Sequence, residues 1–190
     1  MIAIIIAQIG KLVYNINPVR QNQASRMFAI PNQRTQFITG FLICCGLVGQ
    51  ALYFQYGAGM EPCPLCIFQR IAVFALGLIF LLAALVNPTG ILQRLFGFLW
   101  LATAVIGGAI SGRHVWLQNL PADQIPACGP GLDYMLEVFP FTEMLNMVLK
   151  GSGECAEVSW RLLGLSMPGW MLLIFAAFAV FGLWNLFKPK

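Results

Sequence analysis

A pair of cysteines separated by two residues is the feature of the sequence with the clearest chemical meaning. Cys63 and Cys66 stand in the stretch Glu-Pro-Cys-Pro-Leu-Cys, residues 61–66. A disulfide that closes so short a loop adds little stability by the loop-closure model, whereas pairs with this spacing are common carriers of thiol–disulfide exchange. Haem attachment would require a histidine directly after the second cysteine, where Ile67 stands instead. The spacing therefore favours redox chemistry.

The residues around this pair favour a reactive thiol. Pro64 suits the first position of a helix, which predicts that Cys63 is the N-cap and that Cys66 lies in the opening turn. A thiolate at a helix N-terminus is stabilised by the helix dipole and by unpaired N–H groups. Arg70 follows Cys66 by one helical turn on the same face, so its cation can stabilise a thiolate or hold a polar, lipid-soluble ligand. Snorkelling of Arg70 towards water is the alternative.

The other four cysteines divide into two kinds. Cys44 and Cys45 lie within a long apolar segment. Adjacent helical residues point about 100° apart, so these two cannot easily pair with each other. We expect them to act as small hydrophobic side chains, as buried cysteines usually do. Cys128 and Cys155 lie in a more polar segment further along the chain. They fit a structural disulfide or a second exchange pair. A zinc site shared with the Cys-x-x-Cys pair is a weaker alternative, because it lacks a second close pair.

The composition places these residues in a membrane protein. Of 190 residues, 59% are hydrophobic and 9% are charged, and the mean hydropathy is +0.78. A soluble domain is usually about 25% charged, and a core of this size cannot bury so much apolar surface. This composition also excludes a disordered chain and collagen. The basic excess is small and scattered, which excludes a nucleic-acid-binding domain.

Gaps between charged residues predict four membrane spans. A transmembrane helix needs about 20 mainly apolar residues, and four stretches of about this length carry no charge. The predicted spans are approximately Phe37–Tyr56, Ile67–Val86, Leu95–Arg113 and Trp170–Phe187. The sequence therefore predicts an all-α membrane protein, a bundle of four transmembrane helices with two loops on one side, at about 57–66 and 114–166.

The charges also predict how the bundle is oriented. With four spans, the N-terminus, the 87–94 loop and the C-terminus share one side of the membrane. That side carries basic residues and no acidic one: Lys11, Arg20, Arg26, Arg34, Arg94, Lys188 and Lys190. The positive-inside rule therefore places both termini in the cytoplasm. The two longer loops then face an oxidising compartment, where four cysteines fit two disulfides.

This orientation divides the chain into a cytoplasmic segment 1–36, a transmembrane domain 37–187 and a cytoplasmic tail 188–190. Met1–Ile9 is apolar but too short to cross a membrane, and it lacks the basic n-region of a signal peptide. It fits an interfacial segment. The alternative is a natural start at Met27, which leaves a short basic tail before the first span.

Electrons removed from a thiol pair need an acceptor. The chain has no nucleotide-binding glycine loop, no haem motif and no soluble domain for a flavin. A four-helix bundle can hold a small cofactor between its helices, and a membrane quinone would reach Cys66 directly. His114, the only histidine, is predicted at the same outer interface, where it could handle protons or contact the quinone. An interfacial polar residue without such a role is the alternative.

These features resemble the bacterial DsbB family, inner-membrane thiol oxidases that re-oxidise DsbA and keep the periplasm oxidising. The resemblance covers residues from about 37 to 187. It rests on Cys128 and on the segments 61–70, 113–118, 151–157 and 163–170. Residues 141–149, with apolar side chains at helical spacing, resemble the membrane-lying helix of the family's second loop.

The resemblance implies a route for the electrons. A reduced, DsbA-like partner of thioredoxin fold would attack a Cys128–Cys155 disulfide and form a mixed disulfide with Cys128. Cys155 would then exchange with Cys63, and Cys66 would face a bound ubiquinone or menaquinone. Re-formation of the Cys63–Cys66 disulfide would yield quinol. Arg70 and His114 would line the quinone site, and no metal would take part.

Two other functions fit part of the pattern. A quinone-linked oxidoreductase of the vitamin K epoxide reductase type also has a Cys-x-x-Cys pair at the membrane edge, but near the end of a later helix. A non-enzymatic membrane protein with two structural disulfides is the other. Its disulfides would stay oxidised when quinone is withheld.

Overall fold

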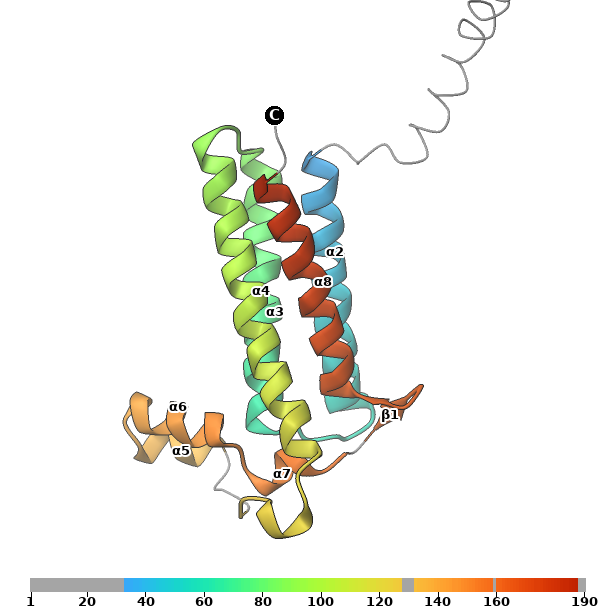
Figure 1. Cartoon of the computed structure of the whole chain (residues 1–190), viewed down its shortest axis with the longest axis vertical. Coiled ribbons are helices and arrows are strands. Elements are labelled where there is room, and N and C mark those ends of the chain that lie inside the picture. The colour runs from blue at the N-terminus through green and yellow to red at the C-terminus, as the bar shows by residue number, and fades with distance from the viewer. Residues whose placement is uncertain (1–32, 128–131, 159, 188–190) are drawn as a thin grey trace, which may run out of the picture. The chain divides into compact units, whose positions relative to one another are not determined.

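The computed structural model describes residues 33–127, 132–158 and 160–187 of the chain. Four long helices dominate them: α2 (Gln33–Leu52), α3 (Pro64–Val86), α4 (Ile91–Gln118) and α8 (Met167–Phe187) (Figure 1). Each helix, taken for α2 together with the turn that follows it, is long and apolar enough to cross a membrane. The all-α membrane fold with four spans is therefore confirmed.

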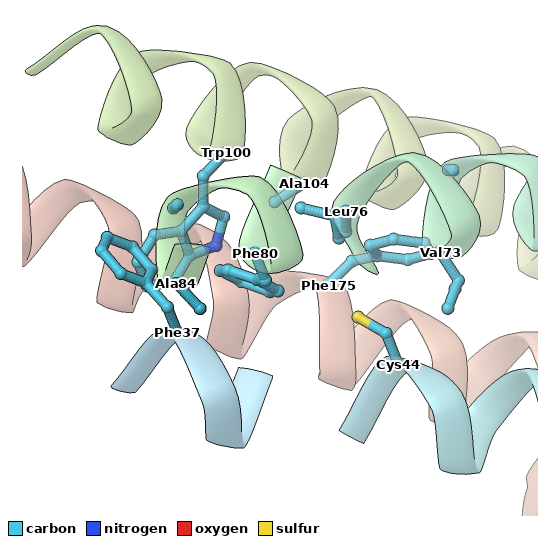
Figure 2. Close-up of a cluster of buried hydrophobic side chains, with 11 residues drawn as sticks. Phe37, Cys44, Val73, Leu76, Phe80, Ala84, Trp100, Ala104 and Phe175 are labelled. Carbon is cyan, nitrogen blue, oxygen red and sulfur yellow. The ribbon is translucent and has the colours of Figure 1, made fainter. Parts of the chain in front are cut away.

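Aromatic packing holds the centre of the bundle together. α4 packs against both α3 and α8, and the rings of Phe37, Phe80 and Trp100 interlock between three helices (Figure 2). Phe80 and Trp100 meet edge to face, with ring centroids 4.8 Å apart, an arrangement that aromatic pairs prefer. Phe175 of α8 is fully buried against Gly107 of α4, where a Cβ atom would collide with the ring.

Large apolar side chains also cover the outside of all four helices. In a soluble protein, an exposed apolar surface of this extent would cause aggregation. Around a membrane-spanning bundle the same surface contacts lipid. Examples with more than half of the side chain exposed are Leu42, Phe74, Leu85, Phe98, Val105, Leu173 and Val180.

α4 is longer than the charge pattern predicts. The sequence places the end of the third span at Arg113 and the start of the second loop at residue 114, whereas α4 continues to Gln118. The charge does not end the helix, because arginine is a good helix former. The Arg113 guanidinium donates hydrogen bonds to two carbonyl oxygens of another helix, those of Leu149 and Lys150, at 3.1 Å each. His114 therefore lies inside α4 and not in a loop.

The segment between α4 and α8 forms short elements at one end of the bundle (Figure 1). They are η2 (Ala122–Gln124), α5 (Leu132–Val138), α6 (Phe141–Lys150), α7 (Gly153–Ala156) and the antiparallel pair β1 (Arg161–Leu162) and β2 (Leu165–Ser166). α6 confirms the helix predicted at 141–149. Its buried face, with Met144 and Val148, joins an apolar cluster that also contains the end of α4 and the start of α3.

Several sequence predictions fall outside the described residues. These are the interfacial segment Met1–Ile9, the alternative start at Met27, the C-terminal tail 188–190 and Cys128. The structure therefore describes one of the two cysteines that were predicted for the second loop, Cys155.

A candidate thiol redox site

Cys63 and Cys66 lie where α3 begins. Cys63 is the N-cap, with extended backbone (φ −65°, ψ 161°), and Pro64 stands in the first turn, which confirms the predicted local structure. The two sulfurs are free thiols 3.1 Å apart. A disulfide bond is about 2.05 Å long, so a small movement of either side chain would bring the two sulfurs to bonding distance.

Cys155 of α7 meets this pair from the second loop. Its side chain is fully buried, and one atom each of Cys63, Cys155 and His114 lie within 4.8 Å of one another. The hydrogen bond that the Cys155 thiol makes to Cys63, together with burial, raises the pKa of Cys155. The structure thus brings together residues that are far apart in the sequence and belong to both loops.

Gly151 directs the chain from α6 into α7 and so positions Cys155. Its φ of +85° is a conformation that only glycine adopts readily, and a Cβ atom there would collide with Leu117. Its N–H donates to the carbonyls of Met147 and Val148, which closes the C-terminus of α6. The tight turn therefore places the loop cysteine against the end of α4.

His114 lies between the thiols. It is 2% exposed, with Nε2 3.8 Å from the Cys63 sulfur and Nδ1 4.0 Å from the Cys66 sulfur. The side-chain nitrogen of Gln69 donates to Nδ1 at 3.2 Å. Since Nδ1 accepts this hydrogen bond, the proton of the neutral ring is on Nε2, which faces Cys63.

Gln69 is a site residue that the sequence analysis missed. It is 4% exposed and lies one helical turn after Cys66, on the face of α3 that meets α4. A glutamine in an apolar helix directly after a Cys-x-x-Cys pair was the available signal. Its partner on another helix could not be known without the packing of α3 against α4.

Arg70 is held in place by the end of α2. Its guanidinium donates to the side-chain oxygen of Gln55 and, at 3.1 Å, to the carbonyl oxygen of Ala51. Gln55 belongs to η1 (Tyr53–Gly57), a π-helical turn that continues α2. Such turns are frequent at functional sites. These bonds orient the cation within the protein, so snorkelling alone does not account for Arg70.

A cavity of about 350 Å³ adjoins the thiols. Cys66, Gln69, Arg70 and His114 contribute to its wall, as does Gln118 from the last turn of α4. Most of the rest is apolar or aromatic and includes Leu47, Val48, Phe54, Val73, Trp160, Trp170, Met171 and Ile174. This volume and mixture are typical of sites for small, mainly apolar ligands. A quinone ring fits this lining, because it is flat and apolar with carbonyl oxygens that accept hydrogen bonds.

Four membrane helices, a dithiol at the start of one of them and an adjoining apolar cavity define a membrane-embedded thiol oxidoreductase. The family model described as disulfide bond formation protein DsbB matches residues 33–185. The chain belongs to the DsbB family, and the predicted resemblance is confirmed.

Individual relatives agree. Disulfide bond formation protein B of Nitrosococcus oceani is 52% identical over 153 residues, 80% of this chain and 90% of the relative. The protein of the same name from Hahella chejuensis is 55% identical over 145 residues, 76% of this chain and 88% of the relative. That of Methylococcus capsulatus is 50% identical over 159 residues, 82% of this chain and 97% of the relative.

The chain is therefore a multi-pass membrane protein that functions in disulfide bond formation, as a quinone-dependent, disulfide-generating oxidoreductase. This membership decides against the two alternative functions. The vitamin K epoxide reductase alternative is also unsupported by position, because the Cys-x-x-Cys pair opens the second membrane helix.

Proposed function

We propose that this chain re-oxidises a periplasmic DsbA-like protein and passes two electrons through its two cysteine pairs to a membrane quinone. A thiolate of the reduced partner attacks a Cys128–Cys155 disulfide at Cys128, and Cys155 is released. The partner's second thiol then resolves the mixed disulfide, so the partner leaves oxidised. The two thiol protons of the partner balance the two that a quinone takes up when it becomes quinol.

Within the chain, Cys155 attacks the Cys63–Cys66 disulfide at Cys63 and releases Cys66 as a thiolate. Once the partner's second thiol has freed Cys128, the Cys128 thiolate attacks the new Cys63–Cys155 disulfide at Cys155, which re-forms Cys128–Cys155 and releases Cys63. Cys63 and Cys66 then give up two electrons and their disulfide forms again. Ubiquinone or menaquinone, when bound, supplies the two-electron acceptor. The residues then restore both disulfides without any net change in the protein.

The contact between Cys155 and Cys63 at the edge of the cavity is the observation that carries this proposal. The pKa of Cys155 is raised by its hydrogen bond to Cys63 and by burial, which makes Cys155 a poor leaving group from a Cys63–Cys155 disulfide. Cys66, the leaving thiolate, lies in the first turn of a helix, one turn from the Arg70 cation. Both features favour transfer from Cys155 towards Cys66.

Three further side chains have proposed roles at the cavity. Arg70 is placed to donate a charge-assisted hydrogen bond to a quinone carbonyl, which such bonds orient strongly. His114, with its proton on Nε2, is placed to donate to the Cys63 sulfur as that sulfur gains charge. Gln69 keeps His114 in this protonation form through Nδ1.

Both termini are proposed to lie in the cytoplasm of a bacterium, with the bundle in the inner membrane. The segments then are 1–36 and 188–190 in the cytoplasm and 37–187 as the transmembrane domain. A reporter fused after Pro88 should be cytoplasmic, and one fused between residues 120 and 150 should be periplasmic, because basic residues without acidic ones mark the first side. A periplasmic signal at Pro88 would overturn the assignment.

Quinone reduction by the purified protein tests the function. In detergent, with an excess of reduced DsbA-like protein, the quinone absorbance should fall as the partner's thiols disappear, one quinone for each dithiol. A partner that lacks its second cysteine should instead accumulate as a mixed disulfide through Cys128 of the wild-type protein, because the resolving thiol is lost. Partner trapped through any other cysteine, or oxidation of the partner without quinone reduction, would contradict the proposal.

A further inference from the structure

We propose that the dithiol form of this site binds a thiophilic divalent cation, for which Zn²⁺ is the physiological candidate, through Cys63, Cys155 and His114. Cys66 is the nearest group to supply a fourth ligand. The metal would hold the enzyme in its reduced form and so act as a reversible inhibitor. This inference goes beyond the proposed electron route, since it needs the side-chain cluster and neither the partner nor the quinone.

The spacing of the side chains fits such a cation. Zinc bonds are about 2.3 Å long to sulfur and about 2.0–2.1 Å to nitrogen, which separates the ligand atoms of a tetrahedral site by about 3.5–3.8 Å. The Cys63 sulfur and the Nε2 atom of His114 are 3.8 Å apart. One ligand atom from each of Cys63, His114 and Cys155 lie within 4.8 Å of one another, so small side-chain movements would complete three bonds.

A third sulfur, which would be the fourth ligand, lies beside this group. The Cys66 sulfur is 3.1 Å from that of Cys63 and 4.0 Å from the Nδ1 atom of His114, and Cys66 lines the cavity. Cys63 and His114 line the same cavity, which therefore provides an entry path to the cluster. Three sulfurs and one imidazole are a common ligand set of tetrahedral zinc sites.

Gln69 can support His114 either as a hydrogen-bond donor through Nε2 or as a metal ligand through Nε2. To bind a metal through Nε2, the ring must carry its proton on Nδ1, and the oxygen of the Gln69 amide must accept that proton. Rotation of the amide by half a turn exchanges its nitrogen for its oxygen at the same place. In metal sites, a histidine ligand usually donates its other ring N–H to a nearby acceptor, which fixes the tautomer and the orientation of the ring.

The net charge of the occupied cluster would be small. Cys63 is the N-cap of α3, and the Arg70 cation follows Cys66 by one helical turn. Each thiol that binds the metal releases one proton to solvent. A cation with two bound thiolates and a neutral imidazole carries no net charge, and a third thiolate would be balanced by Arg70.

Metal binding and the redox state must then oppose each other. In the Cys63–Cys66 disulfide neither sulfur is a thiolate, so the oxidised site lacks two ligands. A bound cation would in turn keep both sulfurs from forming that bond. The proposal thus predicts that only the dithiol form binds the metal.

Titration of the purified full chain with Co²⁺ tests this directly. The protein is reduced, and the reductant is then removed under anaerobic conditions. The titration is made in detergent, with Co²⁺ as the spectroscopic probe. We expect one equivalent to produce the sulfur-to-cobalt charge-transfer band and the intense visible bands of tetrahedral coordination, and one equivalent of Zn²⁺ to remove both. The oxidised protein should produce neither. Octahedral cobalt spectra in both forms, or equal spectra in both, would overturn the proposal.

Variants identify the ligands. Cys155→Ser and His114→Ala should each weaken the metal affinity by more than about tenfold, because loss of a direct ligand exceeds the effect of losing its hydrogen-bond partner. Cys45→Ser is the matched control, an exposed thiol in α2 that should leave the titration unchanged. Gln69→Glu should tighten binding, since a carboxylate accepts the Nδ1 proton more strongly. Thermal unfolding of the oxidised proteins shows that each variant folds.

The outcome is separable from that of the electron route. If Cys155→Ser and Cys45→Ser weaken the metal affinity equally, the cation binds elsewhere and the inference is wrong. If quinone reduction by the wild-type protein is not observed but the cobalt spectrum follows the expected pattern, the metal site stands while the electron route fails.

Discussion

Two pairs of cysteines in neighbouring helices have opposite surroundings. Cys44 and Cys45 are in the middle of α2. Cys44 is 2% exposed in the aromatic core (Figure 2), whereas Cys45 is exposed on the outer surface. Cys63 and Cys66 lie at the start of α3, with their sulfurs 3.1 Å apart beside His114 and a cavity. The same side chain is a space-filling group in one pair and a candidate electron carrier in the other.

The position within the helix decides the chemistry of these thiols. In mid-helix, backbone N–H groups are used by the helix itself, adjacent side chains diverge, and apolar neighbours disfavour a thiolate. At the helix start, N–H groups remain free, a spacing of two residues brings the sulfurs together, and loop residues can reach them. Each prediction below changes one of these conditions.

The largest effect is expected at Cys66. Cys66→Ser should lower quinone reduction by at least about a thousandfold, because the thiolate that faces the cavity is a covalent participant with no substitute. Turnover is measured as quinone absorbance with reduced partner in excess. Formation of the mixed disulfide with the partner should persist in this variant, which distinguishes a blocked relay from a misfolded protein.

Arg70 should have the next largest effect. Arg70→Met should raise the KM for quinone about 10- to 100-fold, since a hydrogen bond from a charged group is worth about 1.5–3 kcal/mol. Arg70→Lys should recover part of the loss, because it keeps the charge but not the planar pair of donors. An unchanged KM in Arg70→Met, measured over a wide range of quinone concentrations, would show that the quinone lies elsewhere.

A smaller effect on turnover is expected from substitutions of His114 and of Gln69, its hydrogen-bond partner. His114→Ala should lower kcat about tenfold with less change in KM than Arg70→Met, because His114 contacts the sulfurs directly. Gln69→Leu should lower kcat by a smaller factor and change its pH dependence, since the ring loses the hydrogen bond that fixes its proton on Nε2. A pH profile of Gln69→Leu that superimposes on that of the wild type would exclude this positioning role.

The smallest effects are expected at the mid-helix thiols. Cys45→Ser should leave turnover unchanged and alter stability by about 0.5 kcal/mol or less, as exposed substitutions usually do. Cys44→Ser should also leave turnover unchanged but cost about 1–3 kcal/mol of stability, because it buries a hydroxyl among apolar side chains. If either variant loses turnover at a temperature where the protein remains folded, the position of a thiol within its helix does not decide whether it takes part in electron transfer.

The sequence predicted the parts of this comparison that depend on local pattern. Charge-free stretches located the four helices, and Pro64 located the cap at Cys63. Charge alone misplaced the end of α4, since arginine is a good helix former and the helix continues past Arg113 to Gln118. A charged residue indicates where the hydrocarbon core of the membrane ends, but the helix itself ends where its backbone hydrogen bonds end.

Contacts between helices were beyond local pattern. His114 was predicted at the same end of the bundle as Cys66, where the structure places it, but its position between the two sulfurs follows from the packing of α4 against α3. Gln69 was missed for the same reason, because its partner is on another helix. The approach of Cys155 to Cys63 was implied only by family resemblance, since it depends on the turn at Gly151.

The proposed relay depends on electron transfer from Cys155 to Cys63, and one cross-link tests that step. In the double variant Cys66→Ser, Cys128→Ser, the two remaining loop-side thiols are Cys63 and Cys155. Mild oxidation followed by proteolysis and mass spectrometry without reduction should identify a disulfide between the peptides that contain them, in high yield and from monomeric protein. If both thiols stay free, or pair with Cys44 or Cys45 instead, the account of the relay is wrong.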